Sequence, residues 1–72
     1  KNEELAFYWY KSAVEKGHID SMNDLALCYE YGSGCEKDLN LAFYWYGQAA
    51  QNGCVYGMFN LGCCYEFGRF GC

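Results

Sequence analysis

The sequence contains no proline, one histidine and few positive charges. Five Lys or Arg residues stand against nine Asp or Glu residues, which gives a net charge of −4. Such a chain repels the phosphate backbone, so nucleic acid is not expected as a partner. No apolar run approaches the roughly 20 residues of a membrane span, so we expect no contact with the membrane interior.

What is present is apolar and aromatic. Hydrophobic residues make up 53% of the 72 positions and aromatic residues 21%, which excludes a disordered chain. The length allows at most one compact unit, whose core is marginal for independent stability. The chain starts at Lys1 and not at methionine. We therefore expect a piece of a longer protein, without a signal peptide.

A repeat of 36 residues organises the sequence. The string LAFYWY occurs at Leu5–Tyr10 and again at Leu41–Tyr46. Without a gap, 14 of the 28 pairs from Leu5/Leu41 to Gly32/Gly68 are identical. A fixed period of this size indicates stacked copies of one small unit, and such arrays usually bind other proteins.

The pattern predicts four helices. Glycines recur where helices should stop, and Gly17 and Gly53 are expected in the left-handed conformation. Asn2, Asp20 and Asp38 are expected to cap the first three helices. The predicted ranges are Glu3–Lys16, about Asp20–Tyr31, Leu39–Gln51 and about Tyr56–Phe67.

Each helix carries an apolar stripe at helical spacing. Small and large side chains alternate along these stripes, which is typical of antiparallel helices packed in pairs. On the first and third helices, Leu5/Leu41, Ala6/Ala42, Trp9/Trp45 and Tyr10/Tyr46 are predicted to form the packing face. On the second and fourth helices, the stripes are Met22, Leu25, Ala26, Tyr29 and Met58, Leu61, Gly62, Tyr65.

These motifs resemble the Sel-one-like repeat, a relative of the tetratricopeptide repeat. Leu61–Tyr65 matches the family's L-G-x-x-Y helix, Gly32–Asp38 its loop, and Ala42–Gly53 its A-x-x-W-Y-x-x-A-A-x-x-G helix. The resemblance covers nearly the whole chain and divides it into a half-repeat (1–19), a full repeat (20–55) and a half-repeat (56–72). It implies an all-α solenoid, a right-handed superhelix of antiparallel helix pairs.

The resemblance also implies protein binding in a concave groove lined by the second and fourth helices. The groove residues carried over onto this chain are Asn23, Leu27, Glu30, Phe59, Cys63 and Glu66. The leading hypothesis is an adaptor or scaffold module for a peptide or partner domain. The alternative is a spacer inside a longer repeat protein, whose exposed ends could self-associate. A distant alternative is β-lactam binding, known for some cysteine-rich bacterial members, whose cysteine pattern this chain lacks.

Six cysteines allow a disulfide framework, a zinc site or free thiols. Cys28 and Cys64 are repeat equivalents, about 10 Å apart if the helices stack, beyond the roughly 7 Å Cα limit of a disulfide. The pairs Cys28/Cys35 and Cys64/Cys72 are equivalent, so either both or neither should bond. We favour free, buried thiols. Free thiols favour a cytoplasmic location, and paired ones a secretory or periplasmic location.

No catalytic constellation is apparent, so we expect neither an enzyme nor a cofactor or metal. His18 follows a helix-ending glycine and is expected to be a solvated turn residue. Glu30 and Glu66 are repeat equivalents and should lie too far apart for an acid–base pair. The pairs Phe7-Tyr8 and Phe43-Tyr44 are expected to pack between helices, with an exposed patch for a partner as the alternative.

Overall fold

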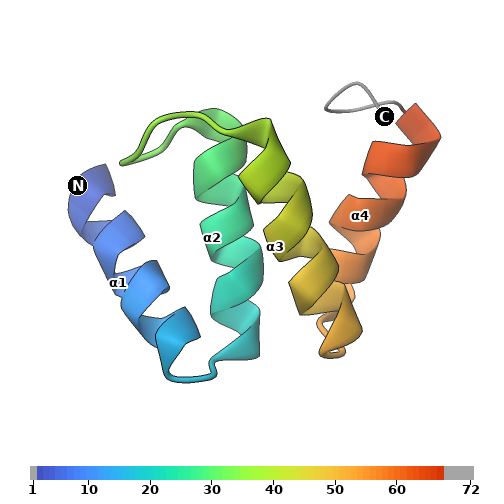
Figure 1. Cartoon of the computed structure of the whole chain (residues 1–72), viewed down its shortest axis with the longest axis horizontal. Coiled ribbons are helices and arrows are strands. Elements are labelled where there is room, and N and C mark those ends of the chain that lie inside the picture. Colours follow the sequence, from blue (N-terminus) through green and yellow to red (C-terminus); the bar gives the residue numbers. More distant parts are fainter. Residues whose placement is uncertain (1, 68–72) are drawn as a thin grey trace.

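The computed structural model describes residues 2–67, and all regular structure in that range is helical. The four helices are α1 (Glu3–Glu15), α2 (Ile19–Tyr31), α3 (Leu39–Gln51) and α4 (Val55–Phe67). They follow one another across the molecule in chain order (Figure 1). The predicted all-α array of four helices is confirmed. Predictions for Gly68 and Cys72, and for the side chains of Cys64 and Tyr65, lie outside the described residues.

The two turns inside the helix pairs have the same hydrogen bonds. Gly17 has φ +90°, and the backbone N–H of His18 donates to the carbonyl of Ala13 at 3.1 Å. The turn at Gly53, with φ +92°, repeats these bonds one period later. This is a Schellman motif, which needs a left-handed residue and satisfies the last carbonyls of the helix. The predicted role of both glycines is confirmed.

The prediction of a cap at Asp20 is wrong. Helix α2 begins at Ile19, and His18 occupies the cap position without a side-chain hydrogen bond. The cause is the preceding motif, because the N–H of His18 closes α1 and the next helix starts at once. The caps at Asn2 and Asp38 are confirmed, since each accepts a hydrogen bond from the backbone N–H three residues on.

The longer connection between α2 and α3 folds back against the start of α1. Gly32 ends α2 with φ +70°, and the N–H of Asp38 donates to the carbonyl of Tyr29 at 2.9 Å. Gly34, with φ +76°, lies so close to the backbone of Glu3 that a Cβ atom there would overlap the Glu3 carbonyl. Only glycine satisfies both the backbone angle and the space at position 34.

The core lies between α2 and α3. A cluster of Ala26, Ala42 and Tyr46 is fully buried there, and Phe43 and Trp45 pack against it. The small alanines allow the two helix backbones to approach, and the large tyrosine fills the space beside them. The buried apolar side chains are Leu25, Ala26, Cys28, Ala42, Tyr46, Ala49 and Cys54.

Equivalent residues in the two copies of the repeat are not equally buried. On α3, Ala42 and Tyr46 are completely buried, whereas α1 has no buried residue. Trp9 is 60% exposed, and Leu5 and Leu41 are exposed as well. The predicted packing face is therefore wrong for these three residues. The reason is position in the array, because α3 packs between the helices α2 and α4, while α2 is the one helix that α1 contacts in the described range.

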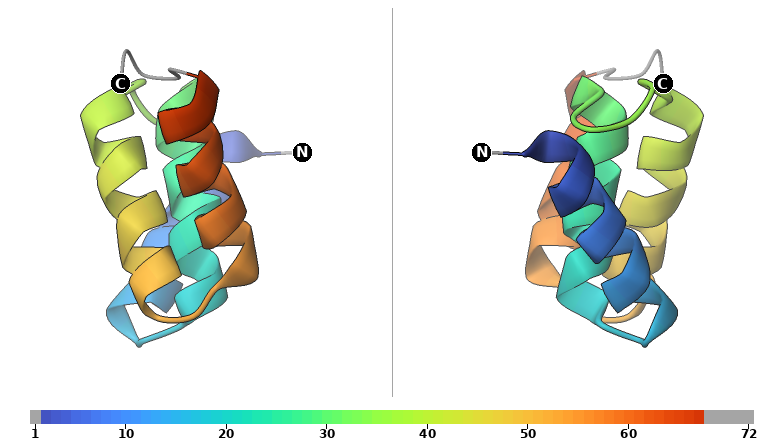
Figure 2. Two further views of the ribbon diagram at one scale, coloured as in Figure 1. Left: turned by 90° about the vertical axis from the view of Figure 1, so that its right-hand side faces the viewer. Right: turned by 90° about the vertical axis from the view of Figure 1, so that its left-hand side faces the viewer.

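Two layers follow from this packing. Helix α2 contacts α4 directly, while α1 and α3 make no close backbone contact among the described residues. Seen from the ends, α2 and α4 lie side by side, with α3 in the other layer (Figure 2). Because the spacing is smaller between α2 and α4, the array curves toward them. These two helices form the concave side.

Candidate interaction surface

Two predicted groove residues of α2 hold helices together. Asn23 is 7% exposed, and its side-chain oxygen accepts a hydrogen bond from the Asn60 amide of α4 at 3.0 Å. Glu30 is half-buried and accepts a hydrogen bond from the Tyr46 hydroxyl at 2.6 Å. The prediction that Asn23 lies on the groove surface is wrong, because its face of α2 turns toward α4. Through this hydrogen bond Glu30 takes part in the contact between α2 and α3.

The repeat equivalents on α4 have the opposite environment. Phe59, which corresponds to Asn23, is 69% exposed, and Glu66, which corresponds to Glu30, is also exposed. In α2 these two positions face the next helices of the array. Among the described residues, no helix covers the same positions of α4.

Leu27 and Cys63 are repeat equivalents, and both are half-buried. Leu27 packs against the core cluster of Ala26, Ala42 and Tyr46. Leu27 also lines a hollow of about 340 Å³ between α1 and α2. The six predicted residues therefore differ in burial: Asn23 is buried, Leu27, Glu30 and Cys63 are half-buried, and Phe59 and Glu66 are exposed.

Sequence reasoning missed the exposed residues beside Leu27. Tyr31 is 68% exposed and lies one helical turn after Leu27, and it lines the same hollow. On α4, Tyr56 is exposed two turns before Cys63. The sequence did contain a signal for them. Tyr31 follows Leu27 by four residues and Tyr56 precedes Cys63 by seven, and both spacings place two side chains on the same face of a helix. Two exposed tyrosines on one side are the kind of side chain that protein interfaces favour.

The hollow between α1 and α2 has an acidic edge. Asp24 and Glu3 line it, and Asp20 lies one helical turn before Asp24. Burial, together with the neighbouring charge of Asp20, raises the pKa of the Asp24 carboxyl above its ordinary value. Both causes penalise the negative charge of Asp24, so a cation placed there would be stabilised.

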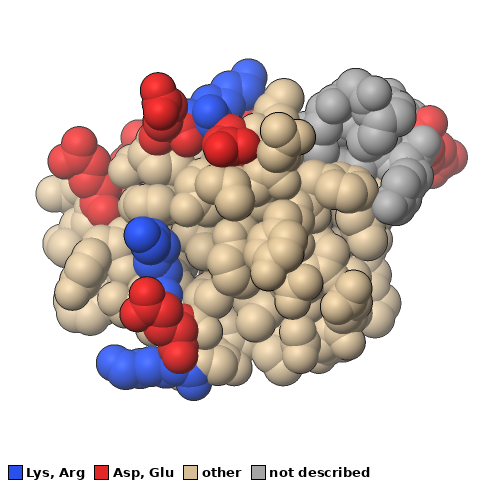
Figure 3. Space-filling model, in the orientation of Figure 1, with Lys and Arg blue, Asp and Glu red and all other residues tan. Residues whose placement is uncertain are grey.

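Charge is distributed unevenly over the two repeats. Helices α1 and α2 carry the charged residues Glu3, Glu4, Lys11, Glu15, Asp20, Asp24 and Glu30, whereas α3 has none and α4 has Glu66. Figure 3 shows the charged side chains around α1 and the loop above it, with a broad uncharged surface in front of α3. The two repeats share their packing residues but not their surface charge.

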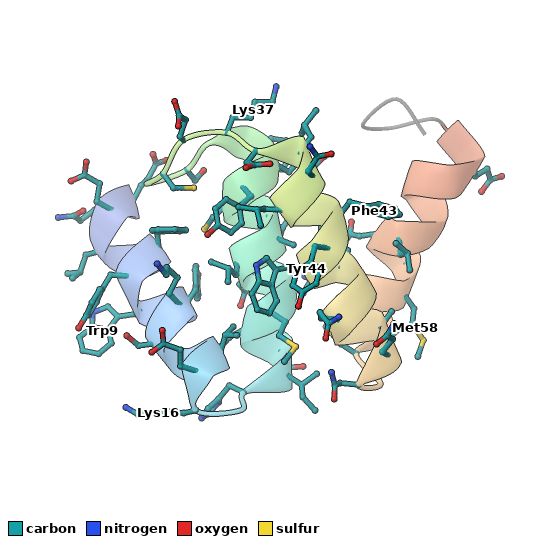
Figure 4. All side chains as sticks on the ribbon, viewed as in Figure 1. Trp9, Lys16, Lys37, Phe43, Tyr44 and Met58 are labelled. Carbon is teal, nitrogen blue, oxygen red and sulfur yellow. The ribbon has the colours of Figure 1, made fainter. Side chains whose placement is uncertain are left out.

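The repeated Phe-Tyr pairs divide between the core and the surface. Phe7 stacks edge-on against Tyr29, with ring centroids 5.5 Å apart, and Phe43 packs against the core cluster. Tyr8 and Tyr44 are exposed. Packing is therefore confirmed for the phenylalanines, while the tyrosines remain accessible from the outer layer, as Tyr44 is in Figure 4.

The described cysteines are free thiols. Cys28 and Cys54 are buried, as predicted for small apolar side chains, and Cys35 and Cys63 are half-buried. The Cys35 thiol donates a weak hydrogen bond to the carbonyl of Cys28, with sulfur and oxygen 3.5 Å apart. Within residues 2–67, no three His, Cys, Asp or Glu side chains converge on a point that could hold a metal ion.

Burial raises the pKa of the Cys28 thiol to about 11, with smaller contributions from Cys35, Asp24 and Glu3. The unfolded thiol loses its proton near pH 9. Between these values the folded chain binds more protons, so the free energy of unfolding falls as pH rises. We expect a loss of roughly 2 kcal/mol over this window.

Urea unfolding from pH 7 to 10.5, under reducing conditions, measures this loss. The matched variant is Cys28→Ala, which keeps the other titrating groups. The stability of the native chain should fall toward that of the variant above pH 9. Parallel curves would contradict the assignment to Cys28.

Of the described helices, none is long and apolar enough to cross a membrane.

Comparison with known families accounts for the repeat. The Sel1 repeat family model matches residues 1–18, 19–54 and 55–72, so that the match spans the whole chain, and no catalytic domain is identified. The second and third matched segments each begin one residue before the boundaries predicted from the sequence. No curated protein is significantly similar to the chain.

Proposed function

Because the chain belongs to the Sel1 repeat family, whose repeats generally mediate protein–protein interaction, we propose that it is an adaptor whose concave side binds a peptide or a segment of a partner protein. The observation that carries this proposal is the strip of Leu27, Tyr31, Asp20 and Asp24 on α2. These side chains combine apolar surface, an exposed aromatic ring and uncompensated negative charge.

The chemistry of this strip favours one kind of peptide. An apolar or aromatic side chain of the ligand would enter the hollow beside Leu27, and a neighbouring Lys or Arg would meet Asp20 and Asp24. None of the lysines among the described residues lines the hollow, so a basic ligand would have no competitor from the chain there. Long-range attraction by the net charge of −4 would also speed the encounter.

Selection from a random peptide library displayed on phage tests the proposal without a known partner. We expect enriched peptides to combine Lys or Arg with an apolar residue, and their affinity to fall as salt rises. Leu27→Ser together with Tyr31→Ala should weaken the selected peptides at least tenfold, since side chains at the centre of an interface contribute most of the affinity.

Tyr44→Ala is the matched control. Tyr44 is an exposed tyrosine of the outer layer, so its removal should leave peptide affinity unchanged. Peptides that bind equally well to the Leu27/Tyr31 variant, or that lose affinity with Tyr44→Ala, would show that the concave side of α2 is not the binding surface.

A further inference from the structure

We propose that Cys28 and Cys35 form a thiol–disulfide exchange site, which a small-molecule disulfide oxidises to an intramolecular disulfide between the end of α2 and the loop that follows it. This goes beyond the peptide-binding proposal, because it is a chemical reaction of two side chains and needs no partner protein. The observation that carries it is the position of the Cys35 sulfur, which lies 3.5 Å from the carbonyl oxygen of Cys28.

The carbonyl oxygen of Cys28 is the point on which the loop after α2 folds back. It accepts hydrogen bonds from the backbone N–H of Gly32, which ends α2, and from the N–H of Ser33 at 2.9 Å. The Cys35 thiol is a third donor to the same oxygen. The two cysteines lie 7 residues apart in the sequence, and this turn of the chain brings the second cysteine back to the first.

Two further contacts hold the loop in this position, beside Lys37 in Figure 4. After Cys35, the N–H of Asp38 donates to the carbonyl of Tyr29 at 2.9 Å. Before Cys35, Gly34 lies against the backbone of α1. The backbone is therefore fixed on both sides of Cys35, and its thiol is held beside α2 without a covalent bond. A fold that holds two thiols together raises their effective concentration and favours the disulfide.

The hydrogen bond of the Cys35 thiol is a weak one. A carbonyl oxygen has two lone pairs, and two backbone N–H groups already donate to that of Cys28. An S–H group is also a weak donor. A rotation of the Cys35 side chain can therefore turn its sulfur from the backbone of Cys28 toward the Cys28 thiol without the loss of a strong contact.

The two thiols differ in access, which assigns their roles. Cys35 is half-buried, whereas Cys28 is 6% exposed. The Cys35 thiolate therefore attacks the small disulfide RSSR first, which gives a mixed disulfide of Cys35 with one RS group and releases RS⁻. The Cys28 thiolate then attacks the sulfur of Cys35 and releases the second RS⁻. Each protein thiol gives up a proton and each RS⁻ takes one, so the two protein thiols are oxidised while RSSR is reduced to two RSH.

Both thiols keep their protons at neutral pH. Burial raises the pKa of the Cys35 thiol, and burial, followed by the effects of Cys35, Asp24 and Glu3, raises the pKa of Cys28. Tyr29 lies near both thiols, and its own pKa is raised mainly by burial. Because the thiolate is the attacking species, exchange is slow at neutral pH and should accelerate about tenfold per pH unit below these pKa values. The reduced pair therefore persists until an oxidant is supplied.

Mass spectrometry after trypsin cleavage reads this site separately from the other cysteines. Trypsin cuts after Lys16 and Lys37, and residues 17–37 contain Cys28 and Cys35 but no further cysteine. After the folded chain reacts with hydroxyethyl disulfide, an uncharged RSSR, this peptide should be lighter by two hydrogen atoms and should no longer react with iodoacetamide. A peptide that is unchanged, that stops at the mixed disulfide, or that is joined to another peptide would overturn the proposal.

Two variants test the order of the steps. With Cys28→Ala, residues 17–37 should keep one RS group, because Cys35 reacts and no second thiol displaces the group. With Cys35→Ala, the same peptide should react at least about tenfold more slowly, because the remaining thiol of Cys28 is buried. Circular dichroism checks that both variants keep native helicity. Equal rates in the two variants would overturn the assigned roles.

A comparison in urea distinguishes a site built by the fold from any two cysteines at this spacing. At a fixed ratio of hydroxyethyl disulfide to mercaptoethanol, the equilibrium constant for closing the disulfide between Cys28 and Cys35 is measured with the same peptide. It should be at least about tenfold larger in the folded chain than in the urea-unfolded chain, since the fold holds the two thiols together. An equal or smaller constant in the folded chain would show that the native loop does not favour the bond, and the proposal would fail.

Discussion

Replacing Tyr46 with alanine should remove a large part of the stability of the chain. Among the described residues, Tyr46 is the largest side chain that is completely buried, and it joins α2 to α3. Removing a buried aromatic ring costs about 3–5 kcal/mol, and a domain of 72 residues has only about 4–11 kcal/mol to lose. Urea unfolding followed by far-ultraviolet circular dichroism should show a large fall in the urea midpoint.

Two further variants separate the causes of this loss. Tyr46→Phe keeps the ring but removes the hydrogen bond to Glu30, which should cost about 1.5–3 kcal/mol because the acceptor is a half-buried carboxylate. Tyr10→Ala removes the same motif residue from α1, where the side chain is only half-buried, and should cost less than half as much as Tyr46→Ala. Equal losses at Tyr10 and Tyr46 would show that the two repeats are energetically alike, contrary to their burial.

Gly57→Ala should destabilise the chain although alanine is the better helix former. Gly57 is buried in α4 against α3, and an added methyl group would lie 2.6 Å from Cβ of Ala49 and 3.0 Å from the backbone nitrogen of Ala50. The two helices would have to separate, which typically costs about 1–3 kcal/mol. The loss is measurable as a lower urea midpoint.

The same substitution at Gly47 should have the opposite sign. Gly47 lies inside α3, and a methyl group added there would meet no neighbouring helix within 4 Å. Gly47→Ala should therefore stabilise by about 0.8–1 kcal/mol through helix propensity alone. If both variants shift the midpoint in the same direction, the close approach of α3 and α4 at Gly57 is not as described.

The periodic features of the fold were accessible from the sequence. The 36-residue register, the glycines Gly17 and Gly53, and the caps Asn2 and Asp38 act through local backbone chemistry. Such features depend on a few neighbouring residues, so a pattern in the sequence suffices to place them. The start of α2 was misplaced because Asp20 looks like a cap, whereas the preceding turn had already set the helix start at Ile19.

The candidate site was less accessible, because it depends on which helix lies beside which. The family resemblance placed Asn23, Leu27 and Glu30 on the groove side of α2, but it could not show that α4 covers Asn23 and that Tyr46 donates a hydrogen bond to Glu30. Tyr31, which the sequence pattern did not single out, proved to be an exposed neighbour of Leu27. A helical wheel shows the direction in which each side chain leaves its helix. Which of these side chains are buried depends on the neighbouring helices.

The sequence by itself therefore determined the helices, their order and the residues that can form a buried face. The tertiary structure decided which copy of each repeated residue is buried. Trp45 packs against the core while Trp9 is exposed, and Tyr46 is enclosed while Tyr10 is only half-buried. The physical reason is that a side chain is buried only where a second helix covers it. In a stacked array the inner helices have neighbours on both sides, and the end helices present identical residues to solvent.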